Sequence, residues 1–449
     1  MRKLPKITIS KKPTYKKFAE DVNFYELFQK VEQIFDTCFL FESLGEEGKF
    51  SRYSIIGFDP RHVISARGNT LFFDEEKYPV ENPYFALREI MPQDIIAKNY
   101  AGGLVGYLSY DAINYFEPSV SVKVHELFDQ FLFGVYTDGV IFDKITGELF
   151  YFYYDKNRLS LVKEIMKTKI KRQKLTIRFV KDGLTKEEHA KIVERVKEEI
   201  KAGNTFQCEV GFKTEYEIKG DTLQIYKKLR EVNPSPFMYY MKFGKKRVIG
   251  ASPELLFSLR NGEMTTRPLA GTIRRGIDEK EDQQLARTLL NDPKEKAEHN
   301  MLIDMQRNDI GRVAQFGTVR VKDLMTIKKF SHVQHISSEV VGLIKKDEDM
   351  FSGLASNFPM GTVCGTPKVE TIKIIDRNEP EARGPYGAGV GLFGFNGDCT
   401  FALALRSLFI VKTYAYAQTS GGIVYDSVAE KEYEEIINKL AAMRKVLSL

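Results

Sequence analysis

Two pairs of glutamates, Glu295 with Glu298 and Glu432 with Glu435, stand far apart in the sequence on two segments that are predicted to be helical. Residues three apart share one face of a helix, so a fold that brings the two helices together would gather four carboxylates. Such a cluster suits Mg²⁺, which takes oxygen ligands and usually keeps water and an anionic substrate in its shell. The alternative is a solvated helix face, because Lys439 follows Glu435 at i+4.

A cationic candidate is Arg406 in the run TFALALRS, residues 400–407. Read as a strand, this run places Ala402, Ala404 and Arg406 on one face, with space above the guanidinium. A guanidinium binds a carboxylate through two parallel hydrogen bonds, and burying it without an anion is costly. The run therefore predicts either a site for an anionic ligand or an internal salt bridge, and the pattern alone does not choose between them.

Three glycine-containing turns are candidate anion-binding loops: Ala270-Gly271-Thr272, Met360-Gly361-Thr362 and Ser420-Gly421-Gly422. Glycine lets the backbone approach a ligand closely, so that successive N–H groups can bind an anion, although each turn taken singly is more often only a turn. The sequence has no Walker-type loop and no G-x-G-x-x-G between a strand and a helix, so nucleotide binding is not predicted.

His332 and His335, in the run FSHVQHISS, are candidates for proton transfer. A histidine that titrates near neutrality can shuttle protons, whereas a lone histidine is usually a satisfied core or surface group. No H-E-x-x-H or other metal spacing surrounds them, and the four cysteines form no C-x-x-C pair. A transition-metal site and a disulfide framework are therefore not predicted.

The helices that must carry the carboxylates have clear start signals. Asp292-Pro293-Lys294-Glu295 supplies a cap residue, a proline in the first turn and an acidic third position, and Gly311 predicts the far end. The C-terminal helix is predicted to start at Ser427, with Glu430 three residues on. Both glutamate pairs thus lie in the first two turns, where the positive helix end stabilises negative charge, so capping competes with metal binding as their explanation.

The rest of the chain predicts an α+β fold of large antiparallel β-sheets packed on each other, with helices on the outside. Residues 14–155 alternate short β-type runs with turn signals, and residues 156–182 are typical of a helix and a strand that lead into a boundary. Thr185 and Glu188 form a capping-box pattern that opens a second region, residues 184–447, in which strands alternate with long helices.

Composition excludes several classes of protein. Among 449 residues, 67 basic and 61 acidic side chains give a formal charge of +6, but the two signs are interspersed, so no nucleic-acid partner is predicted. No apolar run approaches the length of a membrane span, and no apolar run follows the basic N-terminal residues as in a signal peptide. We therefore expect a cytoplasmic protein without a membrane partner.

Eight runs, in order along the chain, resemble the chorismate-utilising enzymes, and most closely the large subunits of anthranilate synthases. They are ASPELL, RPLAGT, KEKAEHNMLIDMQRNDIGRV, SHVQHISS, FPMGTVCGTPK, RGPYGAGVGLFGFNGD, ALRS and GGIVYDSVAEKEYEEIINK. They cover residues 185–447 densely, and FLFES, RYSIIG and GGLVGYLSYD extend the resemblance more loosely toward the N-terminus. The resemblance implies a chorismate-binding catalytic region at 184–447 and an N-terminal region at 14–155 that carries half of a regulatory site.

What the resemblance implies agrees with the candidates found from the residues. Glutamates matching Glu298 and Glu435 would hold Mg²⁺, with Glu295 and Glu432 beside them, and the metal would hold the ring carboxylate of chorismate. Other residues would bind the second carboxylate, on the enolpyruvyl group, or line the same pocket. They are Tyr386, Arg406, Lys439, Ser420, Gly421, Gly422, Gly271, Thr272 and Thr362.

The resemblance also assigns the chemistry. Glu254 matches the general acid that protonates the departing C4 hydroxyl while ammonia attacks ring carbon C2, and His335 is the candidate that assists the later loss of pyruvate. Relatives that add water generally carry lysine where this chain has Gln207, because water needs a base whereas ammonia is already a nucleophile. Ala270 and Thr362 further favour anthranilate over aminodeoxychorismate as the product.

The resemblance therefore implies the activity of an anthranilate synthase large subunit, a carbon–oxygen lyase of tryptophan biosynthesis with Mg²⁺ as cofactor. The chain has no G-x-C-x-G glutaminase motif, so ammonia should come from a separate glutamine amidotransferase subunit in a hetero-oligomer. Two alternatives stay open. One is an aminodeoxychorismate synthase of the folate pathway, and the other is a non-catalytic protein that senses tryptophan or binds through its basic charge.

A feedback site for L-tryptophan is implied as well. FLFES and NPSPFM correspond to the family's usual L-L-E-S and P-S-P-Y-M, so Ser43 with Pro236, Phe237 and Met238 would bind the inhibitor. Phe41 and Phe237 depart from the usual leucine and tyrosine, and the run SGG replaces the usual G-A-G in the substrate pocket. These departures leave open whether feedback is intact and how the substrate carboxylate is held.

Overall fold

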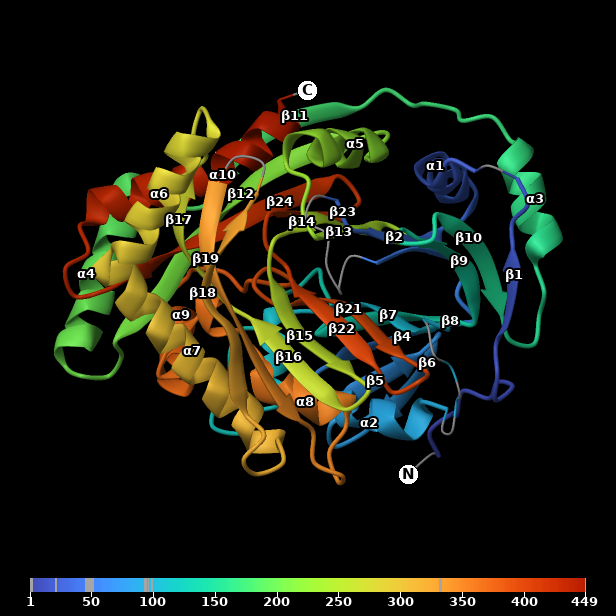
Figure 1. Ribbon diagram of the computed structural model, residues 1–449, viewed down its shortest axis with the longest axis horizontal. Helices are drawn as coiled ribbons and strands as arrows, with labels where there is room; N and C mark the ends of the chain where they lie inside the picture. Colours follow the sequence, from blue (N-terminus) through green and yellow to red (C-terminus); the bar gives the residue numbers. More distant parts are fainter. Residues whose placement is uncertain are drawn as a thin grey trace.

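Aromatic and aliphatic runs form two large antiparallel β-sheets that pack against each other (Figure 1). The computed structural model describes residues 3–20, 22–44, 52–92, 95, 97, 100–330 and 333–448. Apolar side chains from both sheets meet between them, among them Phe39 and Tyr239 from the first sheet and Tyr107 and Val390 from the second. The predicted α+β class with stacked sheets is therefore confirmed.

The first sheet has twelve strands. They are β1 (Thr14–Lys17), β2 (Thr37–Glu42), β3 (Tyr53–Phe58), β9 (Asp138–Asp143), β10 (Glu148–Tyr153), β11 (Thr176–Asp182), β12 (Gln207–Lys219), β13 (Phe237–Phe243), β14 (Lys246–Ser252), β20 (Gly365–Thr366), β23 (Ser407–Val411) and β24 (Tyr414–Ile423). Their order is β1-β10-β9-β3-β2-β13-β14-β23-β24-β12-β11, and β20 pairs with β12.

The second sheet also has twelve strands. They are β4 (His62–Arg67), β5 (Thr70–Phe73), β6 (Glu76–Pro79), β7 (Gly103–Leu108), β8 (Phe131–Tyr136), β15 (Leu255–Arg260), β16 (Glu263–Arg267), β17 (Leu269–Arg274), β18 (Arg320–Lys329), β19 (Val333–Leu343), β21 (Gly389–Gly394) and β22 (Cys399–Leu403). Their order is β17-β19-β16-β15-β22-β21-β7-β8-β4-β5-β6, and β18 pairs with β19.

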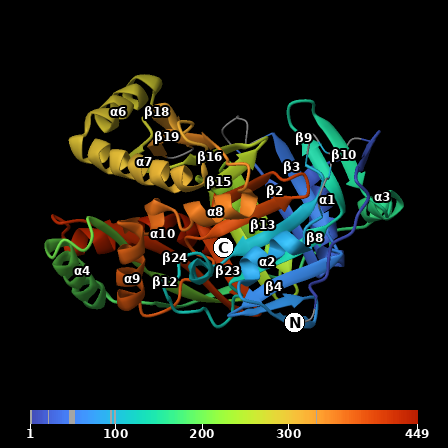
Figure 2. The ribbon, with the colours of Figure 1, turned by 90° about the horizontal axis from the view of Figure 1, so that it is seen from below.

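Helices cover the outside of both sheets. Those that contact the first sheet are α1 (Phe24–Ile34), α4 (Lys186–Lys201), α5 (Leu223–Val232), α9 (Lys368–Asn378) and α10 (Ala429–Leu447). Those that contact the second are α6 (Glu279–Asn291), α7 (Pro293–Val313) and α8 (Met350–Asn357), while α2 (Pro83–Ile90) packs on α8 and α3 (Leu159–Lys167) packs on α1. Figure 2 shows α6 and α7 on one side of the molecule and α4, α9 and α10 on the other. In the described part of the chain, no helix combines the length and the apolar character needed to cross a membrane.

The two regions of the sequence share both sheets. In the first sheet β2, from the N-terminal region, pairs with β13, and in the second sheet β7 pairs with β21. The predicted helix and strand between residues 156 and 182 are present as α3 and β11. The boundary at residue 184 therefore divides the sequence but not the fold, because strands from both sides of it are hydrogen-bonded together in each sheet.

The structure shows which of the predicted cap residues begin a helix. The capping box of Thr185 and Glu188 is formed, and Asp292 accepts the Lys294 and Glu295 N–H groups at the start of α7. Two details of the prediction are wrong. α7 continues past Gly311 to Val313, because packing against α8 and β19 outweighs the roughly 1 kcal/mol that one glycine costs a helix.

The second wrong detail concerns the C-terminal helix. α10 begins at Ala429 after Val428, and Ser427 does not cap it. The Ser427 hydroxyl instead accepts the Val424 N–H at 3.0 Å, in the turn that precedes the helix. A serine followed three residues later by glutamate predicts a cap only when the serine's own hydroxyl is not engaged in a preceding turn.

A buried ion pair ties several of these elements together. Arg383 and Glu379 lie 2.7 Å apart, and their side chains are only 2% and 3% exposed. The Arg383 guanidinium also donates to the carbonyls of Val363 at 2.6 Å and Glu209 at 2.7 Å. Glu379 in turn accepts the Gly211 N–H at 2.9 Å. The pair thus joins the end of α9 to β12 and to the 3₁₀ turn η2 (Gly361–Val363).

Replacing Arg383 by methionine should lower the free energy of unfolding by about 3–5 kcal/mol, because Glu379 would keep a buried charge without its partner. Urea unfolding measures the loss. The control is Arg377→Met, which removes an ion pair with Glu199 at the surface and should cost less than about 1 kcal/mol. Equal losses in the two variants would contradict the special role of the buried pair.

Candidate active site

The predicted substrate-binding residues meet where β12 and β24 run side by side. In this antiparallel pair Glu209 lies opposite Gly422 and Gly211 lies opposite Ser420. Tyr386, just before β21, reaches the same place, with its hydroxyl 3.0 Å from Ser420 Oγ. The Ser420 hydroxyl donates to Glu209 Oε2 at 2.7 Å. Three side chains from distant parts of the sequence thus form one hydrogen-bonded chain in the interior.

Lys439 brings a positive charge from α10 to this chain. Its Nζ donates to the Ser420 carbonyl at 2.9 Å and lies 2.8 Å from Glu435 Oε1. Loss of contact with water disfavours the charged form of Lys439. The carboxylates of Glu209 and Glu435 outweigh this effect and raise the pKa of Lys439. The side chains of Lys439 and Glu435 are 44% and 50% exposed, so both remain accessible to a ligand.

The two glutamate pairs lie within electrostatic reach of each other. Burial, Glu298, Asp292 and Glu435 raise the pKa of Glu295, so a carboxylate on α7 is affected by one on α10. Burial and Glu435 also raise the pKa of Glu432. Glu298 Oε1 accepts a hydrogen bond from Gln207 Nε2 at 3.2 Å. The two pairs therefore lie within electrostatic reach of one another.

This arrangement fits a divalent cation without forming a ready-made cage. Within the described ranges, no three histidine, cysteine, aspartate or glutamate side chains stand close enough together to hold a metal as they are. After burial, the charges of Glu298 and Glu435 raise the pKa of Glu295, and Glu435 raises the pKa of Glu432. A hard cation with oxygen ligands would relieve this repulsion. The Mg²⁺ site stays a prediction.

Glu254 has the properties of a general acid. It lies between β14 and β15, it is 3% exposed, and its Oε1 accepts the Leu269 N–H at 3.2 Å. Burial raises the pKa of Glu254 to about 8, although the Leu269 N–H and the neighbouring Thr362 hydroxyl oppose the rise. The carboxyl group is thus protonated at neutral pH and can donate a proton to a leaving group.

Arg406 does not lie within a strand, so that prediction is wrong. β22 ends at Leu403 and β23 begins at Ser407, and Arg406 between them has a left-handed backbone with φ 48°. Alternation along a sequence cannot reveal such a break, because the residues on both sides still pair in sheets. The guanidinium reaches the interior all the same, where its Nη1 donates to Asn233 Oδ1 at 3.1 Å.

The salt-bridge alternative for Arg406 can now be tested. Among the described residues no carboxylate lies within ion-pair distance of its guanidinium. Burial lowers the pKa of Arg406, and the charge of Glu254 opposes that effect, so these two groups lie within electrostatic reach. A half-buried guanidinium without a carboxylate partner favours the other alternative, a site for an anionic ligand.

His335 is held as a neutral base. Its Nδ1 lies 2.8 Å from the Gly271 carbonyl, so this nitrogen carries the proton, and it lies 3.1 Å from Thr272 Oγ1. Burial lowers the pKa of His335 to about 4. Its Nε2 is buried and has no hydrogen-bond partner in the described structure, which leaves a lone pair for a substrate proton. His332, the other candidate, lies outside the described residues.

Two important residues were missed by the sequence analysis. Glu209 is 7% exposed on β12, and burial raises its pKa to about 7 despite the opposing charge of Lys439. Arg383 fixes the backbone of that strand. The sequence did carry a signal for a buried carboxyl group at Glu209, because this glutamate stands between the apolar residues Cys208 and Val210. Glu379 stands four residues before Arg383, but this spacing alone does not mark a buried pair, because the other partners of Arg383 lie up to 174 residues away.

The predicted regulatory residues also come together. Met238 on β13 pairs with Glu42 at the end of β2, so Ser43 follows directly beside Phe237. The Ser43 side chain is buried, and among the described residues its hydroxyl has no hydrogen-bond partner. Arg230 binds the Glu42 carboxylate at 2.6 Å. Pro236 lies just before β13, and the Leu44 N–H donates to the Ser235 carbonyl at 2.9 Å, so the two half-sites are adjacent.

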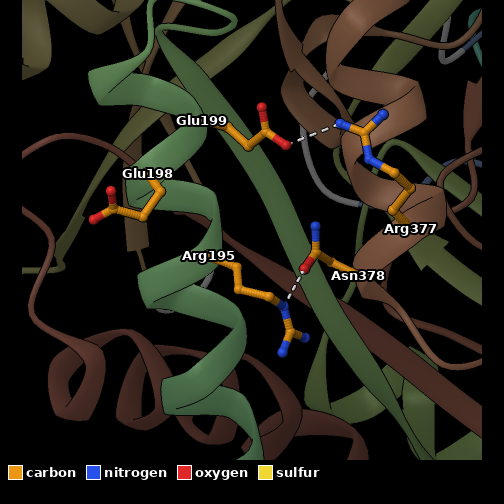
Figure 3. A pocket seen from close by; sticks show the side chains of 5 residues that line it. All are labelled: Arg195, Glu198, Glu199, Arg377 and Asn378. Atoms are coloured by element: carbon orange, nitrogen blue, oxygen red, sulfur yellow. Dashed lines mark hydrogen bonds and ion pairs between the residues drawn. The ribbon is translucent and has the colours of Figure 1, made fainter.

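A surface hollow between α4 and α9 has a volume of about 410 Å³, but its lining is not that of a binding site (Figure 3). Its polar groups largely satisfy one another. Arg377 pairs with Glu199 at 3.0 Å, and Arg195 donates to Asn378 at 2.8 Å. None of the predicted site residues lines it, so this hollow is not the candidate active site.

Sequence comparisons agree with the geometry. The family model described as chorismate binding enzyme matches residues 36–445. An anthranilate synthase component 1 from Leptospira biflexa is 54% identical over 454 residues, which cover 99% of this chain and 98% of the relative. One from Methanothermobacter thermautotrophicus is 38% identical, covering 95% of this chain and 92% of the relative.

Solved structures give the same picture. Anthranilate synthase component I from Streptococcus pneumoniae TIGR4 superposes with a TM-score of 0.79 at 30% identity, covering 89% of this chain and 94% of that chain. The menaquinone-specific isochorismate synthase from Escherichia coli has a TM-score of 0.77 at 19% identity, covering 99% and 96%. The second match shows a shared fold alone.

Replacing Glu254 by glutamine should change how the free energy of unfolding depends on pH. With a pKa near 8 when folded and 4.5 when unfolded, the folded protein holds a proton that the unfolded chain has released. Wild-type stability should therefore fall relative to E254Q as the pH rises from about 5 to about 8, by up to about 1.4 kcal/mol per pH unit. Urea unfolding across this range measures the slope.

The matched control is Glu434→Gln on the exposed face of α10, which should leave the slope unchanged. Parallel stability curves for wild type and E254Q would show that Glu254 is not a buried, protonated acid.

Proposed function

The chain belongs to the chorismate-binding enzyme family, and we propose that it is the large subunit of an anthranilate synthase. Chorismate and ammonia would give anthranilate, pyruvate and water. The observation that carries this proposal is the half-buried Arg406, which lacks a carboxylate partner among the described residues and lies within electrostatic reach of Glu254. A binding group for one substrate carboxylate thus lies near a proton donor.

In the first step, the ammonia nitrogen bonds to ring carbon C2, the two ring double bonds shift, and the bond between C4 and its hydroxyl breaks. Glu254 gives its proton to that hydroxyl, which leaves as water. The new ammonium group releases one of its protons. The raised pKa of Glu254 supports this role, because a carboxyl that is ionised at neutral pH has no proton to give.

In the second step, the proton on C2 leaves and the bond from C3 to the enolpyruvyl oxygen breaks, so the ring becomes aromatic. The enolpyruvate takes up a proton and becomes pyruvate. His335 is the proposed acceptor of the C2 proton. Its support is a neutral ring whose Nδ1 is bound to the Gly271 carbonyl and whose Nε2 has no partner in the described part of the chain.

The substrate carboxylates have separate proposed sites. The enolpyruvyl carboxylate would bind Arg406, the Tyr386 hydroxyl, Lys439 and the backbone from Ser420 through Gly421 to Gly422. Gly271, Thr272 and Thr362 would line the pocket. This assignment is supported by the contact of Lys439 with the Ser420 carbonyl and by the contact of Tyr386 with the Ser420 hydroxyl.

Glu298 and Glu435 are the proposed ligands of Mg²⁺, with Glu295 and Glu432 beside them. Bound there, Mg²⁺ would supply a positive charge that holds the ring carboxylate of chorismate. The mutual effect of the carboxylates on α7 and α10 supports this assignment. Gln207 orients Glu298 through its amide N–H.

Amination, as opposed to hydration, is the proposed outcome because Gln207 offers no base to deprotonate water. Ala270 and Thr362 favour anthranilate over aminodeoxychorismate. The names of the relatives that match along the whole chain agree with this product. Ammonia would come from a glutamine amidotransferase subunit, so we propose a hetero-oligomer that works in the cytoplasm.

Incubation with chorismate, Mg²⁺ and an ammonium salt should give anthranilate, detected by its fluorescence and mass. Addition of EDTA should stop its formation. Glu298→Gln and Glu435→Gln should each lower kcat/KM by at least about a hundredfold, since each removes one charged metal ligand. Glu434→Gln, on the exposed side of α10, is the matched control and should keep wild-type activity.

Each contrary outcome has a distinct meaning. Aminodeoxychorismate as the final product would favour the folate enzyme, and the absence of any turnover would favour a non-catalytic binding protein. Full activity in both E298Q and E435Q would remove the metal assignment.

L-Tryptophan is the proposed feedback inhibitor, bound by Ser43 together with Pro236, Phe237 and Met238. The unpartnered, buried hydroxyl of Ser43 supports this proposal, since it can bind a polar group of a ligand. Phe41 and Phe237 replace the family's usual leucine and tyrosine, so the pocket is more apolar than usual.

L-Tryptophan should therefore inhibit anthranilate formation. Ser43→Ala should raise the concentration for half-inhibition by about tenfold, which is the effect of one lost hydrogen bond to a ligand. Inhibition curves are measured against each variant's own uninhibited rate. Ser54→Ala, another buried serine on the neighbouring β3, is the control, and equal shifts in both variants would rule out a contact specific to Ser43.

A further inference from the structure

Arg406 differs from other guanidiniums of this protein in the partner that it binds. Several of the others pair with carboxylates in the interior. They are Arg158 with Asp138 at 2.6 Å, Arg230 with Glu42 at 2.6 Å and Arg383 with Glu379 at 2.7 Å. Arg406 Nη1 instead donates to the neutral amide oxygen Oδ1 of Asn233 at 3.1 Å, and the two residues are 173 positions apart.

The backbone around Asn233 fixes the position of this residue. Asn233 ends α5, where its N–H donates to the Leu229 carbonyl at 2.8 Å. Its own carbonyl accepts the Ser235 hydroxyl at 3.1 Å, and the Ser235 carbonyl accepts the Leu44 N–H at 2.9 Å. Asn233 itself is only 9% exposed. Its amide therefore offers the guanidinium an acceptor that stays in one place.

The amide can face Arg406 only through its oxygen. A guanidinium carries donors and no acceptor, so the Nδ2 group of Asn233 in that place would set donor against donor. Nδ2 is buried and has no hydrogen-bond partner among the described residues. Within the described part of the chain, the bond to Arg406 is thus the one hydrogen bond of this side chain.

A neutral acceptor and a carboxylate have different effects on a guanidinium. Both fix its orientation, but a carboxylate also cancels its charge and occupies its paired N–H groups. An amide oxygen accepts one N–H and leaves the positive charge and the other donors to a ligand. Arg406 is half-buried, so a ligand can reach those donors.

Building on the proposed function, we propose that Asn233 is the positioning residue for Arg406, which it orients through a neutral bond so that the full charge remains for the enolpyruvyl carboxylate of chorismate. Asn233 thus acts on the affinity for chorismate through Arg406. The competing role is structural, in which the amide only fills its place at the end of α5. The two roles predict opposite rankings of two substitutions.

The test is steady-state kinetics of the full chain, with chorismate varied at saturating Mg²⁺ and ammonium chloride. Asn233→Ala removes the acceptor and should raise the KM for chorismate by about tenfold. Asn233→Asp keeps the shape and an acceptor, but its carboxylate cancels the charge of Arg406 and repels the substrate carboxylate. It should raise the KM by about a hundredfold, more than N233A does, with kcat changed by less than about threefold in both variants.

Asn378 supplies the matched control, because its Oδ1 accepts the Arg195 Nε–H at 2.8 Å in the surface hollow between α4 and α9 (Figure 3). N378A and N378D make the same two changes to an arginine–asparagine pair away from the proposed pocket, so they should leave the KM for chorismate unchanged. In urea unfolding N233D should be at least as stable as N233A, because it gains an ion pair. A higher KM in N233D is then not a loss of folded protein.

A KM in N233D that is near the wild-type value, or lower than that of N233A, would overturn the proposal, because the shape of the side chain and not its charge would then matter. Unchanged KM values in both variants would overturn it as well. If the wild type forms no anthranilate, the proposed function fails, whereas wild-type turnover with the wrong ranking overturns the role of Asn233 alone.

Discussion

Arg383 and Glu379 form an ion pair whose two side chains are almost wholly buried, and the active site is built around it. Such a pair is stable only when hydrogen bonds satisfy both partners. Here the guanidinium donates to the carbonyls of Val363 and Glu209, and the carboxylate accepts the Gly211 N–H. These backbone groups belong to a turn and a strand more than a hundred residues apart. The pair therefore holds Thr362 in a fixed position relative to the strand that carries Gln207.

The order of strands places the predicted regulatory site near the general acid. β13 lies between β2 and β14, so its Phe237 pairs with Ser252 at the end of β14 on one side and lies next to Ser43 on the other. Ser252 Oγ then accepts the Glu254 N–H at 3.2 Å. A ligand between Ser43 and Phe237 would press on the strand that positions Glu254. If L-tryptophan binds there as proposed, a short hydrogen-bonded route would connect it to Glu254.

Features fixed by local chemistry could be predicted from the sequence. The Asp292 cap predicts the start of α7 and, with it, the shared face of Glu295 and Glu298. Features fixed by distant contacts could not. Arg406 breaks a strand through a left-handed residue, which alternation does not reveal. The hydrogen-bonded chain from Tyr386 through Ser420 to Glu209 exists only because β12 and β24 pair across more than two hundred residues.

The balance of charge around the proposed site bears on the proposed Mg²⁺. Five carboxyl groups, those of Glu209, Glu295, Glu298, Glu432 and Glu435, surround a region with two cations, Lys439 and Arg406. Burial is the main cause of the raised pKa values of Glu209, Glu295 and Glu432, and neighbouring glutamates add to it. A dicarboxylate substrate would add two negative charges. If Mg²⁺ binds there as proposed, its charge and the carboxylates of the substrate would stabilise each other, so each should bind more tightly in the presence of the other.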